Sequence, residues 1–388
     1  MFTKLEDGLL ARFEPHNNQI FVLCDNELYT FDEASPTYTN IKTMLPEPST
    51  WNEPYLSTPY SVQLQLTKGC NFSCTFCYAN SQRGNRTMDM PIEKVKSTID
   101  SLFEWGVPNV SYVGGEIFFR SDLPEIIDYA HQLGLSQTMI TNGIIPGSQP
   151  DKYKSTLEKF HKIQVSMNGV HEVYDESVQT KMFDRFVEYA RNIASINQNV
   201  WISCVINENN VMQIKEVLET TRKIGARGIR FAVVAKQGRG AGAEADYFRR
   251  ILPLAEQELQ KTIHDYPELE IETHFNPQLT VQKGDPLPPY LHFRGEGHLA
   301  LYISMEGHIY PFPFLERPEF IAGNAFTDDL PTVWKTSEVL HTFRNPEIVN
   351  SNCKECPTPC SLSSLSMSYL WTGSLSGKVP CYRWDYQA

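Results

Sequence analysis

Three cysteines, Cys70, Cys74 and Cys77, lie within eight residues of one another. Their spacing is C-x3-C-x2-C, which offers three thiolates to a metal centre. A cubane iron–sulfur cluster that is ligated only by protein takes four thiolates, so three leave one iron free to bind another molecule. Structural zinc sites more often close a tetrahedron with C-x2-C pairs. The spacing therefore predicts a [4Fe–4S] cluster with one open iron, where chemistry can occur.

The same stretch resembles the signature of the radical S-adenosylmethionine (SAM) superfamily, C-x3-C-x-aromatic-C, with Phe76 as the aromatic residue. In that family the amine and the carboxylate of SAM chelate the open iron, and one electron from the reduced cluster cleaves SAM to a 5′-deoxyadenosyl radical. The resemblance implies both cofactors for this chain, SAM and a radical SAM [4Fe–4S] cluster. It also implies an external one-electron reductant such as flavodoxin or ferredoxin.

Three further motifs resemble that family and follow in the expected order. Gly114, Gly115 and Glu116 end a strand-like run, and the resemblance assigns them to the amino group of SAM. Glycine lets the backbone approach a ligand closely, and a carboxylate accepts from an ammonium. Residues 138–143 resemble a strand that ends in Thr-Asn-Gly, and residues 162–169 resemble one that ends in Ser-x-Asp-Gly. The implied cofactor-binding residues are Tyr78, Gly114, Gly115, Glu116, Thr141, Asn142 and Ser166.

Apolar runs of strand length alternate with amphipathic helical stretches along the middle of the chain. The expected strands are residues 61–66, 110–113, 136–140, 163–167, 200–206 and 228–235, and the expected helices include residues 92–105, 123–133, 181–196 and 211–224. Six such units predict an α/β fold with a partial (β/α)6 TIM-like barrel. The signature residues come just after strands, so we expect the active site at the rim formed by the carboxyl ends of the strands.

The composition predicts a protein of the cytoplasm. No apolar run approaches the roughly 18 residues of a membrane span, and the N-terminal residues lack the basic and apolar regions of a signal peptide. Nine cysteines in a reducing compartment point to metal ligation rather than to disulfides. The formal net charge of −12 speaks against nucleic acid, because phosphate-binding surfaces are basic. We expect neither a nucleic acid nor a membrane as a partner.

A second group of cysteines lies near the C-terminus, at Cys353, Cys356, Cys360 and Cys381. From spacing alone, zinc and an iron–sulfur cluster fit these four thiols about equally. The tail resembles the SPASM or twitch-like extension of radical SAM peptide maturases, which carries auxiliary clusters. A full SPASM domain has two further cysteines at about the places where this chain has Arg294 and Phe312. The resemblance therefore implies one auxiliary [4Fe–4S] cluster here, not two.

The first 55 residues have a different character. Apolar and polar residues alternate on both sides of Asp25-Asn26, which predicts a hairpin of residues 19–24 and 27–31. This β-rich element fits two roles, a reduced module that captures the leader of a precursor peptide as an added strand, or a structural cap. The expected domains are residues 1–55 for this element and its linker, 56–290 for the barrel and 291–388 for the SPASM or twitch-like domain.

The resemblance implies a radical SAM iron–sulfur oxidoreductase that modifies a ribosomally synthesised precursor peptide. An auxiliary cluster can accept an electron from a substrate radical, so we expect oxidative cross-linking through a carbon–carbon or thioether bond. A peptide epimerase and a small-molecule radical SAM dehydrogenase are the alternatives. Cys204, on an expected strand, is the candidate hydrogen donor for epimerisation, although packing in the core is the favoured explanation for a cysteine at that position.

Overall fold

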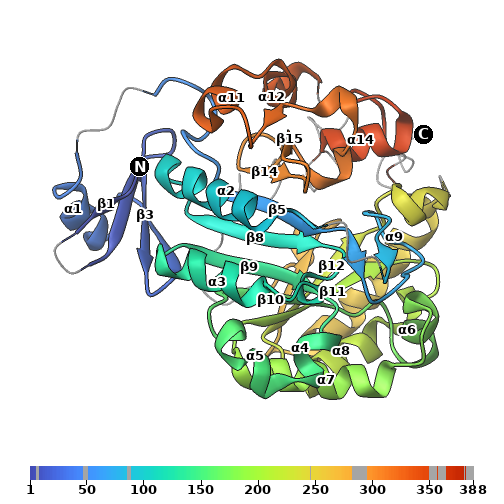
Figure 1. Cartoon of the computed structure of the whole chain (residues 1–388). Coiled ribbons are helices and arrows are strands. Elements are labelled where there is room, and N and C mark those ends of the chain that lie inside the picture. Colours follow the sequence, from blue (N-terminus) through green and yellow to red (C-terminus); the bar gives the residue numbers. More distant parts are fainter. Residues whose placement is uncertain are drawn as a thin grey trace.

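A ten-stranded sheet forms the centre of the structure, which is a computed structural model (Figure 1). The structure describes residues 1–5, 8–46, 51–84, 89–244, 246–281, 295–348, 356, 364–379 and 381. The strand order is β13-β12-β11-β10-β9-β8-β5-β14-β15-β16. The strands are β5 (Ser61–Thr67), β8 (Asn109–Gly114), β9 (Ser136–Thr141), β10 (Lys162–Ser166), β11 (Val200–Ile206), β12 (Gly228–Val233), β13 (Glu270–Thr273), β14 (Ala300–Ile303), β15 (His308–Tyr310) and β16 (Gly323–Asn324).

The strands from β13 to β5 run parallel, and helices connect them. These helices are α2 (Ile92–Trp105), α3 (Leu123–Gln132), α4 (Ile144–Ser148), α5 (Pro150–Leu157), α6 (His171–Val178), α7 (Phe183–Ile196), α8 (Ile214–Ile224) and α9 (Tyr247–Thr262). Apolar residues at helical spacing, such as Val95, Ile99 and Leu102 on α2, are fully buried in one core shared with the strands. The predicted partial radical SAM-type barrel is confirmed.

Each barrel strand presents two different faces. On β10, Ile163 and Val165 are fully buried in the core, whereas the alternate residues Lys162, Gln164 and Ser166 are only half-buried. Arg230 of β12 reaches over β11 to place Nη1 3.5 Å from Oε1 of Gln164, which shows that these alternate residues line the concave side of the sheet. The helices therefore cover the convex side, and a polar lumen lies on the other.

The structure adds strands to the six that the sequence predicts. β13 pairs with β12 at one end of the parallel array, and β14 pairs in parallel with β5 at the other. β13 reads Glu-Ile-Glu-Thr, a short run in which charged residues alternate with a single isoleucine and hide the strand pattern. β15 and β16 continue the sheet in antiparallel register, so the C-terminal region shares one sheet with the barrel. Its helices are α11 (Leu330–Thr336), α12 (Glu338–Arg344) and α14 (Leu365–Thr372).

The N-terminal residues form a separate antiparallel sheet. It consists of β1 (Thr3–Lys4), β2 (Leu10–Glu14), β3 (Gln19–Cys24) and β4 (Glu27–Phe31), followed by α1 (Pro36–Lys42). The predicted hairpin is present as β3 and β4, and both turn residues have positive φ, 49° at Asp25 and 62° at Asn26. The Asn26 side chain also donates to the carbonyls of His131 and Leu135, which joins this turn to the end of α3.

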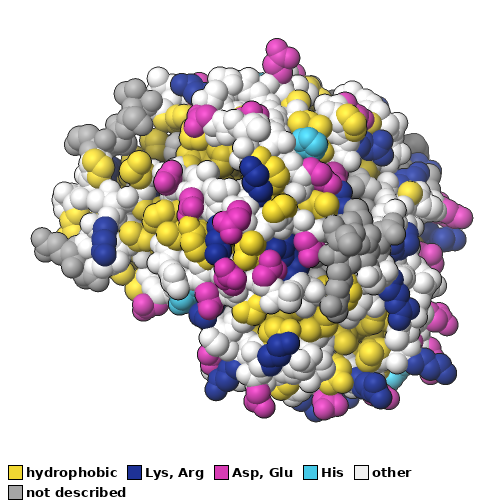
Figure 2. Space-filling model, in the orientation of Figure 1, with side chains coloured by type: hydrophobic (Ala, Val, Ile, Leu, Met, Phe, Trp, Pro, Cys, Tyr) yellow, Lys and Arg dark blue, Asp and Glu magenta, His cyan; other side chains and the backbone are white. Residues whose placement is uncertain are grey.

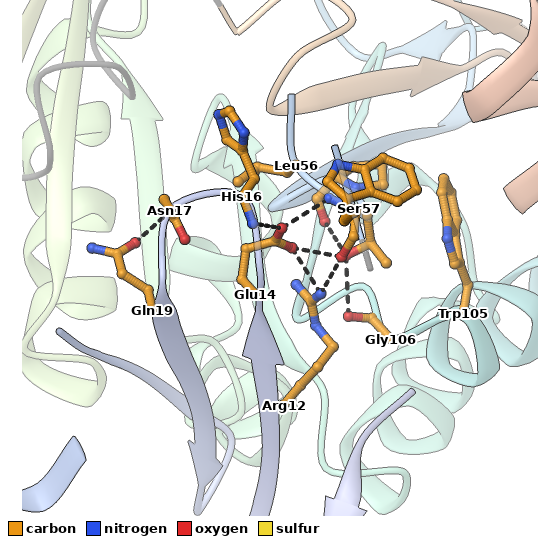
Figure 3. Close-up of polar contacts among 12 residues, drawn as sticks. Arg12, Glu14, His16, Asn17, Gln19, Leu56, Ser57, Trp105 and Gly106 are labelled. Atoms are coloured by element: carbon orange, nitrogen blue, oxygen red, sulfur yellow. Dashed lines mark hydrogen bonds and ion pairs between the residues drawn. The ribbon is translucent and has the colours of Figure 1, made fainter. Parts of the chain in front are cut away.

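A buried ion pair fixes the N-terminal sheet to the barrel (Figure 3). Arg12 Nη1 donates to Glu14 Oε2 at 2.9 Å, and only 4% of the arginine side chain and none of the glutamate side chain is exposed. Ser57, just before the barrel, donates to both carboxylate oxygens of Glu14, from its backbone N–H at 3.0 Å and from Oγ at 2.7 Å. Because each side of the junction supplies part of this network, the sheet and the barrel are held in one relative position.

Acidic and basic side chains are interspersed on the face of the molecule that Figure 2 shows. Among the described helices, none combines the length and the apolar character needed to cross a bilayer.

Replacing Arg12 by Met tests the junction, because it leaves the Glu14 carboxylate buried without its cation. We expect the free energy of unfolding to fall by about 3–5 kcal/mol, the range measured when one partner of a buried pair is removed. Urea denaturation provides the measurement. The control is Lys96→Met, which removes an ion pair with Glu125 at the surface and is expected to change stability little. Equal effects of the two variants would contradict a stabilising role for the buried pair.

Candidate active site

The three cysteines of the signature lie on the loop that follows β5. Cys70 ends the short strand β6 (Gly69–Cys70), which pairs with β7 (Gln82–Arg83), and Cys74 and Cys77 follow in irregular turns. Burial raises the pKa of Cys70 to about 11, and the charge of Glu116 adds to the effect. Burial and then the charges of the other two thiols raise the pKa of Cys74 to about 12. Three thiolates this close would repel one another unless a cation compensated them.

The three thiols lie close enough to one another to ligate one cluster. The charges of Cys70 and Cys77 both act on Cys74. The thiolates around a cubane each bind a different iron, so they do not have to converge on one point. The donor set of Cys70, Cys74 and Cys77 therefore fits a [4Fe–4S] cluster.

The loop after β12 holds the cysteine loop in place. Arg239 Nε donates to the carbonyl of Cys74 at 2.6 Å, and Nη1 donates to the carbonyl of Ser81 at 3.0 Å. The backbone N–H of Arg239 donates to the carbonyl of Cys77 at 3.0 Å. Gly238, with φ at 57°, makes this approach possible, because a Cβ there would collide with the carbonyl of Cys77. Arg239 thus fixes the backbone at Cys74 and Ser81 through its guanidinium and at Cys77 through its own N–H.

Glu116 lies fully buried at the carboxyl end of β8. Its Oε1 accepts from Thr141 Oγ1 at 2.8 Å and from the Phe118 N–H at 3.1 Å, and its Oε2 accepts from the Asn142 N–H at 2.7 Å. Burial raises the pKa of Glu116, whereas these three donors favour the ionised form. The carboxylate is oriented by its donors and suited to accept from an ammonium group of a ligand.

Two glycines bring Glu116 close to the cysteine loop. The Gly115 N–H donates to the Thr67 carbonyl at 2.8 Å, and the Glu116 N–H donates to the Gly69 carbonyl at 2.8 Å. A Cβ at Gly115 would collide with the Gly69 carbonyl, and one at Gly114 would collide with the Thr67 carbonyl. Any larger residue would separate the carboxylate from Cys70.

The turn after β9 reaches the same loop. Asn142 Nδ2 donates to Asn71 Oδ1 at 2.7 Å. Ser166 ends β10 on the lumen face, next to Ser203 of β11 in register. Asn168, which stands where the family has Asp, accepts from the Val205 N–H at 2.7 Å and so ties β10 to β11. The carboxyl ends of four neighbouring strands thus supply the residues that the sequence assigned to SAM.

A cavity of about 580 Å³ opens beside the cysteine loop. It lies between Thr75 and Phe76 of that loop, Asn168 and Asn207 at the ends of β10 and β11, and Tyr247 of α9. Its volume is within the range of small-molecule sites in proteins. The cavity offers room next to the cluster loop for part of a nucleoside cofactor.

The C-terminal region also contacts the cysteine loop. The ring of Tyr78, directly after Cys77, packs edge-on against Phe314 with the ring centroids 4.9 Å apart. Lys68, two residues before Cys70, forms an ion pair with Glu316 at 2.5 Å. Tyr78 therefore contacts a protein ring in this structure, and its assignment to cofactor binding stays a prediction.

Cys204 lies away from the other predicted site residues. It alternates with Ser203 and Val205 on β11, so it shares the helix-facing side with Ile202 and Ile206, and all three are fully buried. Burial raises the pKa of its thiol to about 12. This position is that of a core residue, the favoured explanation from the sequence.

The second cysteine group is described in part. Cys356 and Cys381 are half-buried, whereas Cys353 and Cys360 lie outside the described residues. The ligand set proposed for an auxiliary cluster therefore stays a prediction.

Arg239 is the functional residue that the sequence argument missed. The only local signal in the sequence is its place between Gly238 and Gly240. Glycines on both sides of an arginine permit a close backbone approach. Nothing nearby in the sequence identifies the segment that is approached.

Replacing Arg239 by Gln tests the hold on the cysteine loop. Hydrogen bonds from a charged donor contribute about 1.5–3 kcal/mol each, so we expect reconstituted protein to lose iron to a chelator about tenfold faster or more. Iron release followed by absorbance gives the rate. Arg222→Gln on the exposed side of α8 is the matched control and should release iron as the unmodified protein does. If both variants behaved alike, the hold on the loop would not depend on Arg239.

Comparison with known proteins agrees with this geometry. Residues 64–221 match the model of the radical SAM superfamily. The chain is 27% identical over 323 residues to the mycofactocin maturase MftC of Mycolicibacterium smegmatis, covering 78% of this chain and 76% of that protein. It is 24% identical over 312 residues to the AdoMet-dependent heme synthase of Oleidesulfovibrio alaskensis, covering 75% and 78%.

A solved structure shows the same fold. Streptococcus suis SuiB bound to S-adenosylmethionine superimposes with a TM-score of 0.70 and 17% sequence identity, over 98% of this chain and 99% of that one. The similarity extends beyond the barrel to the N-terminal antiparallel sheet and the C-terminal region. The family match covers the segments that carry Cys70, Glu116 and Ser166, so residues 64–221 form a radical SAM domain, and the chain is a radical SAM enzyme.

Proposed function

We propose that this protein is a peptide maturase, and more narrowly that it forms an oxidative carbon–carbon or thioether cross-link in a ribosomally synthesised precursor peptide. The observation that carries the proposal is the convergence of the cysteine loop with Glu116 at the rim of a polar lumen. When bound, SAM and the cluster supply a 5′-deoxyadenosyl radical that removes a hydrogen atom from a substrate carbon. The similarity to the mycofactocin maturase MftC, and to SuiB, whose structure was solved with its precursor peptide SuiA, supports a peptide as the substrate class.

The chain's own residues orient the reactants in this proposal. Glu116 accepts from the amino group of SAM, and Thr141 and Asn142 hold its carboxylate in place. Ser166 contacts SAM from β10. The lumen begins next to Glu116, Thr141, Asn142 and Ser166. A substrate side chain that enters it is therefore held close to the reacting atoms and away from bulk water.

An oxidative product requires a place for the second electron. We assign this role to one auxiliary [4Fe–4S] cluster bound by Cys353, Cys356, Cys360 and Cys381, and an external reductant such as flavodoxin or ferredoxin supplies the first electron. In the proposed division, residues 1–55 form the N-terminal element, 56–290 the barrel and 291–388 the auxiliary-cluster domain. The outer strand β4 supports leader capture by strand addition, because it is an edge of its sheet.

Epimerisation is the second candidate, since it needs a thiol that returns a hydrogen atom to the substrate. Cys204, the residue named for that role, lies on the helix-facing side of β11 and not on the lumen face. This placement favours oxidation over epimerisation. A small-molecule substrate is the third candidate, which the heme synthase relative supports.

The iron content tests the auxiliary cluster. Two cubanes contain about eight irons per chain, whereas the radical SAM cluster alone contains about four. We expect about eight after anaerobic reconstitution, and about four in a variant with Cys353, Cys356, Cys360 and Cys381 all changed to Ala. Metal analysis gives both values. About four irons with stoichiometric zinc in the unmodified protein would contradict the auxiliary cluster.

The mass of the product tests oxidation against epimerisation. The enzyme is incubated in deuterated water with SAM, dithionite and a candidate precursor peptide, taken from a short reading frame sought next to its gene. We expect the peptide to lose about two mass units per modification, because a hydrogen atom, a proton and an electron leave it.

The control is the variant in which Cys70, Cys74 and Cys77 are Ala, which should leave the peptide and SAM unchanged. A gain of one mass unit that disappears in Cys204→Ala would show epimerisation instead. SAM cleavage without any change in the peptide would contradict the maturase function.

A further inference from the structure

The lumen of the barrel contains charged side chains that the proposed SAM site does not use. Lys162 of β10, Arg230 of β12 and Glu272 of β13 all alternate with fully buried core residues, which places them on the lumen face. Arg230 and Glu272 each keep between a quarter and a third of their side-chain surface accessible, at 30% and 25%. Arg230 and Glu272 are therefore surrounded by protein but still open to a ligand.

Both carboxylates of this group are matched by an arginine. Arg230 Nε lies 3.3 Å from Glu272 Oε1, and Arg227 Nε lies 2.5 Å from Glu270 Oε1 at the amino end of the strands. Arg230 Nε also lies 2.5 Å from His274 Nε2, which must accept and is therefore unprotonated at that nitrogen. Burial and then the charge of Arg230 lower the pKa of His274, so the histidine adds no positive charge at neutral pH.

Lys162 is the cation that remains. Its Nζ lies 3.7 Å from the centroid of the Trp201 ring, and the described residues provide no carboxylate in ion-pair contact with it. Burial lowers the pKa of Lys162 to about 8. On the lumen face Lys162 and Arg230 thus share one carboxylate, Glu272, whereas Arg227, just before β12, pairs with Glu270 at the amino end of the strands.

A purely structural role explains this excess charge poorly. The charges of Glu272 and Glu270 act on Lys162, but each carboxylate is already paired with an arginine. A buried ammonium in this position costs stability, because it loses hydration that an aromatic ring and shared carboxylates only partly replace. The whole chain carries a net charge of −12, so a surplus cation inside the barrel is also contrary to the general composition. A site that receives an anion would recover the lost stabilisation.

The site lies within reach of the reacting end of the lumen. Ser166, Ser203, Arg230 and Glu272 stand side by side in register on β10 to β13, so the Cα atoms of Ser166 and Arg230 are roughly 10 Å apart, two strand spacings. Lys162 precedes Ser166 by four residues, about 13 Å along the strand. A substrate that reacts near Ser166 would present its more distant groups to Lys162.

We propose that Lys162, with Arg230 and Gln164 as neighbouring donors, binds a carboxylate of the substrate in the lumen. The carboxylate is an acidic side chain or the C-terminal carboxylate of the peptide, and the proposal rests on the peptide substrate proposed above. Since an extended chain spans about 3.3–3.6 Å per residue, this carboxylate lies within about four residues of the carbon that reacts.

The test compares Lys162→Met with the unmodified enzyme on the candidate precursor peptide of the mass experiment. Three further peptides have the acidic residues near the modified position changed to Asn or Gln, the C-terminus amidated, or both. We expect Lys162→Met to raise the KM of the native peptide about tenfold or more, the loss typical of a removed charge-assisted hydrogen bond. The peptide that lacks the recognised carboxylate should show the same high KM with both enzymes, and the other peptides show which carboxylate is bound.

Two controls separate recognition from folding. Lys162→Arg keeps the charge and should retain most of the affinity, and Lys154→Met on the exposed surface of α5 should change nothing. In Lys162→Met the melting temperature should not fall and should rise if anything, because the variant no longer buries an ammonium group. The dissociation constant for SAM, measured by equilibrium dialysis, should not change.

Three results would overturn the proposal. An equal rise in KM for every peptide would show that no carboxylate is recognised. Weaker binding of SAM would show that Lys162 acts on the carboxylate of SAM instead. An unchanged KM with a lower melting temperature would show that Lys162 only stabilises the fold.

Failure of the proposed function is distinguishable from failure of this site. If the unmodified enzyme cleaves SAM but changes no peptide, the maturase function is wrong. The site is then tested directly by calorimetric titration of N-acetylglutamate amide against N-acetylglutamine amide. Binding of the acid but not the amide, lost in Lys162→Met, would support the carboxylate site, and equal titrations would refute it.

Discussion

Three thiols must be held together on a loop that has almost no regular structure, and much of the surrounding architecture serves that requirement. Backbone carbonyls on such a loop need donors, and the donors come from distant parts of the chain. Arg239 supplies them from beyond β12, and Glu116 supplies one to Gly69 from the end of β8. Because parallel strands bring their carboxyl ends to one edge, residues far apart in sequence meet around the loop. The barrel topology thus substitutes for the local structure that the loop lacks.

The alternation of side chains along each strand divides the barrel into two environments. On β11, Ser203 faces the lumen while Cys204 is enclosed in the core, although the two residues are adjacent. On β10, Lys162 and Ser166 share the lumen face because four residues are two full periods of a strand. The same rule therefore places Cys204 in the core and Lys162 on the lumen face.

The sequence predicted what depends on local pattern and missed what depends on contacts across the chain. Strand and helix periods gave α2 and β11 with the observed limits, and Asp25-Asn26 gave the first hairpin, because these features are set by neighbouring residues. The motif residues Glu116, Thr141 and Asn142 were found by resemblance, and the structure joins them by hydrogen bonds. Arg239 could not be found in this way, since it lies 165 residues from its partner Cys74. The strand β13 was missed because Glu272 faces the lumen and pairs with Arg230, so the strand lacks the run of apolar residues that identifies the others.

Phe312 shows how a departure from a family pattern is accommodated. A full SPASM domain has a cysteine at about this place, but here the Phe312 ring packs edge-on against Phe314 at 5.0 Å, and Phe314 packs against Tyr78 at 4.9 Å. Three aromatic rings therefore run from the hairpin of β14 and β15 to the residue after Cys77. Aromatic packing of this kind is apolar and dense, so it excludes water from this place. A metal centre at the same place would be charged instead. The ion pair of Lys68 with Glu316 then fixes the same two segments at a second point. The C-terminal region is held against the cysteine loop by packing and charge, so in this chain the contact between them does not require a cluster at that position.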